Sequence, residues 1–413
     1  MKKLKIIDDG NAVSPKGFVA SGISAGLKNK KKDLSLILSE KEATAAMVVT
    51  ANTLKAAPIK WNSQHFHVGD KKKGILINSG NANACTGQEG LDKIDLIAEE
   101  INNTYNIPRD KMLFASTGVI GVPLPQEKII NALEKLFNNK GNKSSNGEDA
   151  ARAILTTDLV TKTIAVQVTL KDKVVTIGAM AKGSGMICPN MATMLCFITT
   201  DLNIQGDCLQ KILNDAVADS FNMISVDGDM STNDTVIVLA NGMAENEMVT
   251  LDNLDEDENQ VLIEAFDIIH KALAKSIAKD GEGATKLMEV QIMGADTKEN
   301  ARIIAKQIVD SSLVKTAVFG ADANWGRVVM AVGSTGIAID ENVLQMHFAS
   351  KVGKVDVLAE GRPLEFDEDL ATKILSEDEM RIIFNLNMGN CEATAWGCDL
   401  SYDYVKINGS YRS

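Results

Sequence analysis

The sequence predicts an α/β fold, because strand-like and helix-like segments alternate along most of the chain. Apolar and polar residues alternate in residues 33–38, as in a half-buried strand, whereas the apolar residues of 87–105 recur at helical spacing. The chain has 413 residues, of which 45% are hydrophobic and 4% aromatic. This length and composition predict one large composite unit or two lobes, built around an aliphatic core.

In the first half of the chain, the predicted strands are followed by polar loops or amphipathic helices. Residues 138–147 are rich in Lys, Asn and Ser and are expected to form an exposed loop. Strands are expected at residues 33–38, 45–50, 74–78, 112–116, 163–170 and 174–181, and helices at 87–105, 125–137 and 148–155.

The second half continues this alternation. Residues 255–279 form the longest helical pattern, acidic at its start and rich in Lys toward its end, which suits the helix dipole. Further helices are expected at 207–221, at 297–311 and after the loop 321–327, and strands at 194–199, 235–239, 314–319, 343–348, 354–359, 381–387 and 402–407.

Charge and cysteine usage argue against several classes of function. The formal net charge of −12 argues against nucleic acid or an anionic membrane as the main partner. No run is apolar enough for a signal-peptide core or a membrane span, so we expect a cytoplasmic protein. The six Cys include no C-x-x-C pair and have no His at zinc spacing, which predicts reduced thiols and no metal site.

The most unusual stretch is 182–197, which reads KGSGMICPNMATMLCF. Gly183 and Gly185 permit positive φ angles, and Thr193 directly precedes an apolar, strand-like run. The simplest interpretation is a glycine-rich turn that leads into a buried strand. A phosphate-binding loop is not indicated, because the G-x-x-x-x-G-K-[ST] order is absent. A third interpretation makes Thr193 a nucleophile held at the end of the strand.

A Thr hydroxyl needs a base to take its proton. The four His lie outside any nucleophile motif, so a His-based triad is not indicated. The α-amine of Thr193 itself would serve if the bond between Ala192 and Thr193 were cut, because an α-amine has a pKa near ~8. Cys188 and Cys196 flank this residue, and a thiol nucleophile remains an alternative.

Seven segments, in the same order along the chain, resemble the ornithine acetyltransferase family, also called the bifunctional arginine biosynthesis proteins. The central segment KGSGMICPNMATML is similar to the self-cleavage and nucleophile motif of that family. The other six are INSGNANACTG (77–87), STGVIG (116–121), ILTTD (154–158), DGDMSTNDT (227–235), FGADANWGR (319–327) and SYDYVKINGSYRS (401–413). A match of this breadth is much more specific than one glycine-rich motif.

The resemblance implies a layered α/β fold of two intertwined chains that arise from one self-cleaved precursor, with an N-terminal Thr nucleophile as in related aminopeptidases. The cut is expected between Ala192 and Thr193. It would leave an α chain of residues 1–192 and a β chain of residues 193–413, assembled as a heterotetramer of two α and two β chains. The implied reaction moves an acetyl group from N-acetylornithine to glutamate through an acetyl-Thr193 intermediate. No metal or bound cofactor is implied, and acetyl-CoA remains open as a further acetyl donor.

The resemblance also implies roles for individual residues. Thr117 and Gly118 would form the oxyanion hole, since a hydroxyl and a backbone N–H are suitable hydrogen-bond donors. The alternative interpretation of this pair is a turn that ends a strand and has no catalytic role. Lys182 suits a substrate carboxylate and Glu282 suits an ammonium group. The full set of implied substrate-binding residues is Thr156, Lys182, Thr193, Glu282, Asn408 and Ser413.

Two segments near these residues admit more than one interpretation. The family usually has Pro-Lys shortly after the residue matching Asp158, whereas this chain has LVTK at 159–162, so the contact is either Thr156 or Thr157. The acidic turn 227–234 lacks the final Glu of an EF-hand, and is predicted to be structural and not a cation site.

Two other functions remain open. A self-processed N-terminal-nucleophile hydrolase would pass the acyl group to water, and would release acetate without making N-acetylglutamate. A small-molecule binding protein with the same loops would remain one intact chain, and its binding would be indifferent to the substitution Thr193→Ala.

Overall fold

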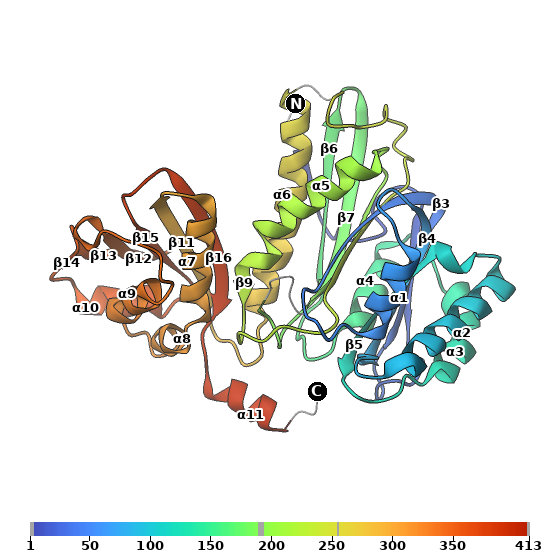
Figure 1. Ribbon diagram of the computed structural model, residues 1–413, viewed down its shortest axis with the longest axis horizontal. Helices are drawn as coiled ribbons and strands as arrows, with labels where there is room; N and C mark the ends of the chain where they lie inside the picture. Colours follow the sequence, from blue (N-terminus) through green and yellow to red (C-terminus); the bar gives the residue numbers. More distant parts are fainter. Residues whose placement is uncertain (1–3, 189–193, 254–255, 411–413) are drawn as a thin grey trace.

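The computed structural model describes residues 4–188, 194–253 and 256–410, and these form two lobes side by side (Figure 1). The larger lobe contains most of the first 280 residues, and the smaller lobe most of the remainder. Each lobe is built around its own β-sheet with helices packed against it. The predicted α/β class is therefore confirmed.

The sheet of the larger lobe has nine strands among the described residues, in the order β1-β6-β7-β8-β10-β3-β4-β5, with β2 paired to β3. The pairs β8/β10 and β4/β5 are parallel, whereas β7 runs antiparallel to β8. The strands are β1 (Leu4–Ile7), β2 (Phe18–Ile23), β3 (Leu34–Val49), β4 (Lys71–Asn81), β5 (Met112–Val119), β6 (Lys162–Leu170), β7 (Lys173–Lys182), β8 (Leu195–Thr200) and β10 (Thr235–Ala240).

Helices cover both faces of this sheet. Successive side chains of a strand point to opposite faces, so neighbouring residues of one strand contact different helices. On β3, Ala45 packs in the cluster that contains α4, whereas Ala46 packs in the cluster that contains α5 and α6. A third cluster joins the β3–β5 end of the sheet to α2 and α3. The helices are α1 (Ala57–His65), α2 (Gly87–Tyr105), α3 (Gln126–Asn138), α4 (Ser144–Ile154), α5 (Gly206–Ala218) and α6 (Glu256–Lys279).

The smaller lobe contains a sheet of seven described strands, in the order β14-β13-β12-β15-β11-β16-β9. Strand β9 comes from the middle of the chain and pairs with β16, which ties the two lobes together. The strands are β9 (Ile224–Ser225), β11 (Leu287–Ala295), β12 (Gln345–Ser350), β13 (Gly353–Ala359), β14 (Arg362–Pro363), β15 (Glu379–Asn385) and β16 (Cys391–Cys398). The helices are α7 (Lys298–Asp310), α8 (Ser312–Phe319), α9 (Trp325–Gly333) and α10 (Glu368–Leu375).

The last helix, α11 (Tyr402–Ser410), leaves the smaller lobe and lies below the junction of the two lobes in the view of Figure 1. This segment was predicted to be a strand, and that prediction is wrong. Its Tyr-Asp-Tyr-Val start fits a strand, but the segment pairs with none of the described strands, and a helix satisfies its backbone internally. None of the described helices is long and apolar enough to cross a membrane.

Three other sequence predictions were wrong in type or extent. Residues 314–319 belong to helix α8, whose start is capped by the side chain of Ser311, because a short apolar run does not distinguish a strand from a buried helix. The strands expected at 33–38 and 45–50 are one strand, β3, with only a register shift between Leu38 and Ala43. The expected loop 138–147 ends early, because α4 already begins at Ser144.

Candidate functional site

A cavity of about 420 Å³ lies at the carboxyl ends of β5 and β7, next to the loop after α4, the loop after α6, and α11. It is lined by six of the residues that were predicted from the sequence to form the site. These are Thr117, Gly118, Thr156, Lys182, Glu282 and Asn408. The other three predicted residues, Ala192, Thr193 and Ser413, lie outside the residues that the structure describes.

The oxyanion-hole candidates, Thr117 and Gly118, are at the end of β5. Gly118 is registered against Gly80 of β4 and has a φ of +132°. A Cβ atom at Gly118 would lie 2.4 Å from the carbonyl carbon of Gly80, so no other residue fits without moving the backbone. This close approach of two strands holds the Thr117-Gly118 pair at the cavity wall.

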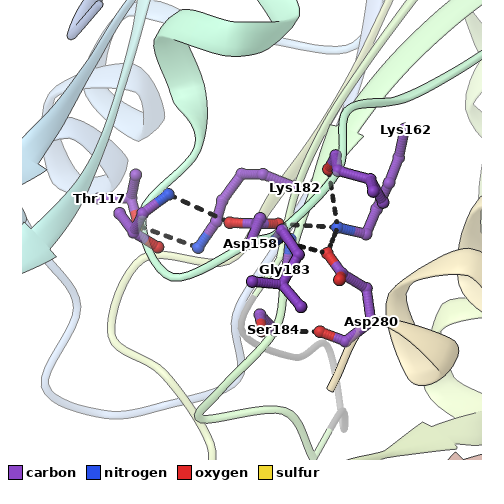
Figure 2. Close-up of polar contacts among 10 residues, drawn as sticks. Thr117, Asp158, Lys162, Lys182, Gly183, Ser184 and Asp280 are labelled. Atoms are coloured by element: carbon purple, nitrogen blue, oxygen red, sulfur yellow. Dashed lines mark hydrogen bonds and ion pairs between the residues drawn. The ribbon is translucent and has the colours of Figure 1, made fainter. Parts of the chain in front are cut away.

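Lys182, the last residue of β7, is the buried cation of the cavity. Only 4% of the residue is exposed, and its Nζ donates to Thr117 Oγ1 at 3.4 Å. Figure 2 shows Asp158 between Lys182 and Lys162. Burial lowers the pKa of Lys182, and the carboxylate of Asp158 opposes this shift. A buried ammonium group beside the oxyanion-hole candidates is suited to a substrate carboxylate.

Asp158 remains ionised although its side chain is fully buried. Burial by itself would raise its pKa, but the charges of Lys182 and Lys162 and the N–H of Gly183 outweigh this effect and lower the pKa to about 2. Its Oδ2 also accepts a hydrogen bond from Thr156 N at 3.1 Å. One carboxylate thus contacts the predicted Thr and stabilises the predicted Lys. Thr156 and Thr157 both line the cavity.

We expect the free energy of unfolding to depend on pH through Asp158. Folding depresses its pKa from 3.8 to about 2, so its stabilising contribution is present above the unfolded value and is lost as the pH falls through the folded value. The pKa shift corresponds to about 2 kcal/mol. Chemical denaturation of the wild type and Asp158→Asn should therefore show a stability difference that shrinks as the pH falls from about 4 to about 2. A difference independent of pH over this window would contradict the assignment.

A second wall of the cavity, formed by the loop after α6, is anionic. Glu282 is 8% exposed, and its Oε2 accepts a hydrogen bond from Asn408 Nδ2 at 2.8 Å. A Cβ atom at Gly185 would lie 2.4 Å from this oxygen, so the glycine permits the approach of the carboxylate. Helical spacing brings Tyr404 and Asn408, four residues apart on α11, to the same cavity.

The sequence analysis did not assign site roles to three residues that help to form the cavity. Asp227 accepts hydrogen bonds from the backbone N–H groups of Met186 and Ile187 at 2.7 and 2.8 Å, and Tyr404 Oη donates to it at 3.3 Å. The third, Asn233, donates from Nδ2 to the carbonyls of Ala82 and Ser116 at 2.7 and 2.8 Å, next to Thr117. The turn 227–234 therefore has the structural role that was predicted for it. Its match to the family motif at 227–235 was the available signal.

The first residues of β8 lie between Lys182 and the strand β10 that follows the turn 227–234. Leu195 is registered opposite Lys182, and the carbonyl of Met194 accepts a hydrogen bond from Thr235 N. Thr193 thus directly precedes, in sequence, a backbone segment that is fixed at the edge of the site. The described part of the chain contains no group of three or more His, Cys, Asp or Glu side chains that is arranged to hold a metal ion.

The two nearby cysteines do not favour the thiol alternative. Burial raises the pKa of Cys188 to about 11, and its Sγ donates to Asp310 Oδ2 at 3.4 Å. Burial raises the pKa of the fully buried Cys196 further. Because the thiolate is the nucleophile, neither thiol is activated at neutral pH.

A second cavity, of about 550 Å³, lies between α6 and the sheet of the smaller lobe. Its walls are mostly charged, and several of the charges pair with one another, as Lys279 and Glu379 do at 2.7 Å. None of the six predicted site residues that the structure describes lines it. The cavity around Lys182 is therefore the candidate active site.

Comparisons with known proteins show the family of the chain. The model of the ArgJ family matches residues 19–413. The chain is 48% identical to the arginine biosynthesis bifunctional protein ArgJ of Caldanaerobacter subterraneus subsp. tengcongensis, over 98% of this chain and 99% of that protein. It is 47% identical to arginine biosynthesis bifunctional protein ArgJ 1 of Clostridium acetobutylicum, over 100% of both chains. A crystal structure of arginine biosynthesis bifunctional protein argJ from Bacillus halodurans is 44% identical and covers 52% of this chain and 98% of its own, with a TM-score of 0.48. The chain therefore belongs to the ArgJ family.

Proposed function

We propose that the protein transfers an acetyl group from N-acetylornithine to glutamate in arginine biosynthesis, with Thr193 as the nucleophile. The observation that supports this most directly is the composition of one cavity. It combines an oxyanion-hole pair, Thr117 and Gly118, with a buried cation, Lys182, and a buried carboxylate, Glu282. An N-acetylated diamino acid has the complementary groups, which are an acyl carbonyl, a carboxylate and an ammonium.

The proposed reaction has two halves. Thr193 Oγ attacks the acetyl carbonyl while its α-amine takes the hydroxyl proton, and Thr117 with Gly118 stabilises the oxyanion. The carbon–nitrogen bond then breaks, and ornithine leaves with that proton on its amine. In the second half, the glutamate amine attacks the acetyl-Thr193 ester, a proton returns to the Thr hydroxyl, and N-acetylglutamate leaves. Neither half requires a metal or a bound cofactor.

The free α-amine requires cleavage of the bond between Ala192 and Thr193. We propose that this cleavage leaves chains 1–192 and 193–413 in contact and that they assemble as two α and two β chains in the cytoplasm. Strands of both chains alternate in the larger sheet, since β8 and β10 lie between β7 and β3. Separation of the two chains would therefore break this sheet on both sides of β8 and β10.

The transfer is tested with N-acetylornithine and isotopically labelled glutamate. We expect labelled N-acetylglutamate and ornithine in equal amounts, with the parallel-line kinetics of a covalent intermediate. Release of acetate without labelled product would support the hydrolase alternative. Replacement of N-acetylornithine by acetyl-CoA in the same assay determines whether the enzyme also uses this donor.

Glu282→Gln is expected to raise the KM for N-acetylornithine by ~10- to 100-fold, because a hydrogen bond to a charged group contributes about 1.5–3 kcal/mol. Gln keeps the size of the side chain and an oxygen that accepts from Asn408. The matched control is Glu379→Gln, at an exposed carboxylate outside the cavity, which should leave KM unchanged. An unaltered KM in correctly processed Glu282→Gln would remove Glu282 from the substrate site.

A further inference from the structure

Lys162 is a buried cation that does not line the candidate active site. It is the first residue of β6, and its side chain is 1% exposed. Its Nζ donates to Asp158 Oδ1 at 2.9 Å and to Asp280 Oδ2 at 2.5 Å (Figure 2). With Lys182 the group contains two cations and two anions, so its formal charges balance. Burial of four charged groups costs free energy unless the charges are closely paired and hydrogen-bonded.

The first partner, Asp158, belongs to the cationic wall of the cavity. Its Oδ1 also accepts from Gly183 N at 2.7 Å, directly after Lys182, and its Oδ2 accepts from Thr156 N. Displacement of Asp158 would therefore disturb two hydrogen bonds, one to Thr156 and one to the turn that follows Lys182.

The second partner, Asp280, belongs to the anionic wall. Its carbonyl accepts a hydrogen bond from Ser184 Oγ at 2.7 Å, and the carbonyl of Ser184 accepts from Glu282 N at 2.9 Å. Its carboxylate also accepts from Leu159 N at 3.1 Å. Lys162 is thus the side chain that joins the two aspartates, and through them the wall with Lys182 to the wall with Glu282.

We propose that Lys162 is a positioning residue that sets the separation between Lys182 and Glu282, and so selects the length of the diamino-acid substrate. This inference rests on the proposed function, in which Lys182 takes the carboxylate of the substrate and Glu282 its ammonium group. Ornithine has one methylene fewer than lysine between these two groups. A fixed separation favours one length, because a longer chain must fold or displace a wall.

The test uses the variant Lys162→Met/Asp280→Asn, which removes one charge of each sign. It leaves Asp158 as the counterion of Lys182, and so avoids the unpaired buried charge that a single substitution would create. The measured quantity is a ratio: kcat/KM for N-acetylornithine divided by kcat/KM for N²-acetyllysine. We expect this ratio to fall at least ~10-fold relative to wild type, because the ion-paired link through Lys162 is lost and only hydrogen bonds, such as that of Ser184, still join the two walls. A purely structural role would lower thermal stability or the yield of folded protein, and would leave the ratio unchanged.

Two further variants make the result decisive. Lys279→Met/Glu379→Gln removes an exposed ion pair with the same charge balance, and should keep the wild-type ratio. Ser184→Ala removes one buried hydroxyl between the walls and should shift the ratio in the same direction by a smaller amount. It provides the test if the double variant does not fold. An unchanged ratio in the folded variants would overturn the inference.

Binding separates this inference from the proposed function. Calorimetric titration of the wild type and variants with ornithine and with lysine gives the ratio of the two dissociation constants without turnover. A wild type that binds ornithine in preference to lysine but transfers no acetyl group would contradict the proposed function alone. If this preference is the same in Lys162→Met/Asp280→Asn, the inference about Lys162 fails, whatever the enzyme catalyses.

Discussion

Thr193→Ala is expected to leave the precursor as one intact chain of 413 residues without detectable acetyl transfer. The substitution removes both the hydroxyl that attacks and, by preventing cleavage, the α-amine that acts as base. Denaturing intact-mass analysis of the wild type should give two fragments, 1–192 and 193–413, and the second should begin Thr-Met-Leu. The variant should give one mass. Loss of a nucleophile together with its base lowers kcat by ~10⁴-fold or more in comparable systems.

The control for this experiment is Thr193→Ser, which retains a hydroxyl and, after cleavage, an α-amine. We expect processing to continue and part of the activity to remain. An intact chain in an active, well-folded wild type would exclude the α-amine of Thr193 as the base. Cleavage of Thr193→Ala at the same bond would instead show that the hydroxyl of residue 193 is not needed for processing.

Thr117→Val is expected to lower kcat by ~10²- to 10³-fold, with little change in KM, because it removes one donor of the proposed oxyanion hole. Valine has nearly the shape of threonine, so the wall at the end of β5 should be preserved. The comparison is made on fully processed protein, in single-turnover experiments that follow release of ornithine. Thr117→Ser restores the hydroxyl and should recover most of the rate.

A raised KM with an unchanged kcat in Thr117→Val would contradict this role. That result would mean that the hydroxyl binds the ground state as strongly as the transition state. The contact between Thr117 Oγ1 and Lys182 Nζ, at 3.4 Å, would then be the more important one. The two explanations therefore differ in which kinetic constant changes.

Local sequence patterns predicted the long, regular elements of the fold well. Helix α2 spans Gly87–Tyr105, as predicted, because its apolar residues keep helical spacing over five turns. Short apolar or alternating segments were misassigned: α8 and α11 are helices at positions where strands were expected. The strand β16 and the helix α1 were not predicted at all. Their type depends on which neighbouring surface is available, and single-segment patterns contain no such information.

The sequence by itself determined the family and six residues of the cavity, because the resemblance matched them position by position along the chain. Only the tertiary structure decided how these residues are held. Asp158 ends the matched segment ILTTD, but nothing in the local pattern of Lys162 or Asp280 distinguishes them from surface charges. Folding removes them from water, and buried charges need partners. That physical requirement brings the three side chains together behind the site and joins its two walls.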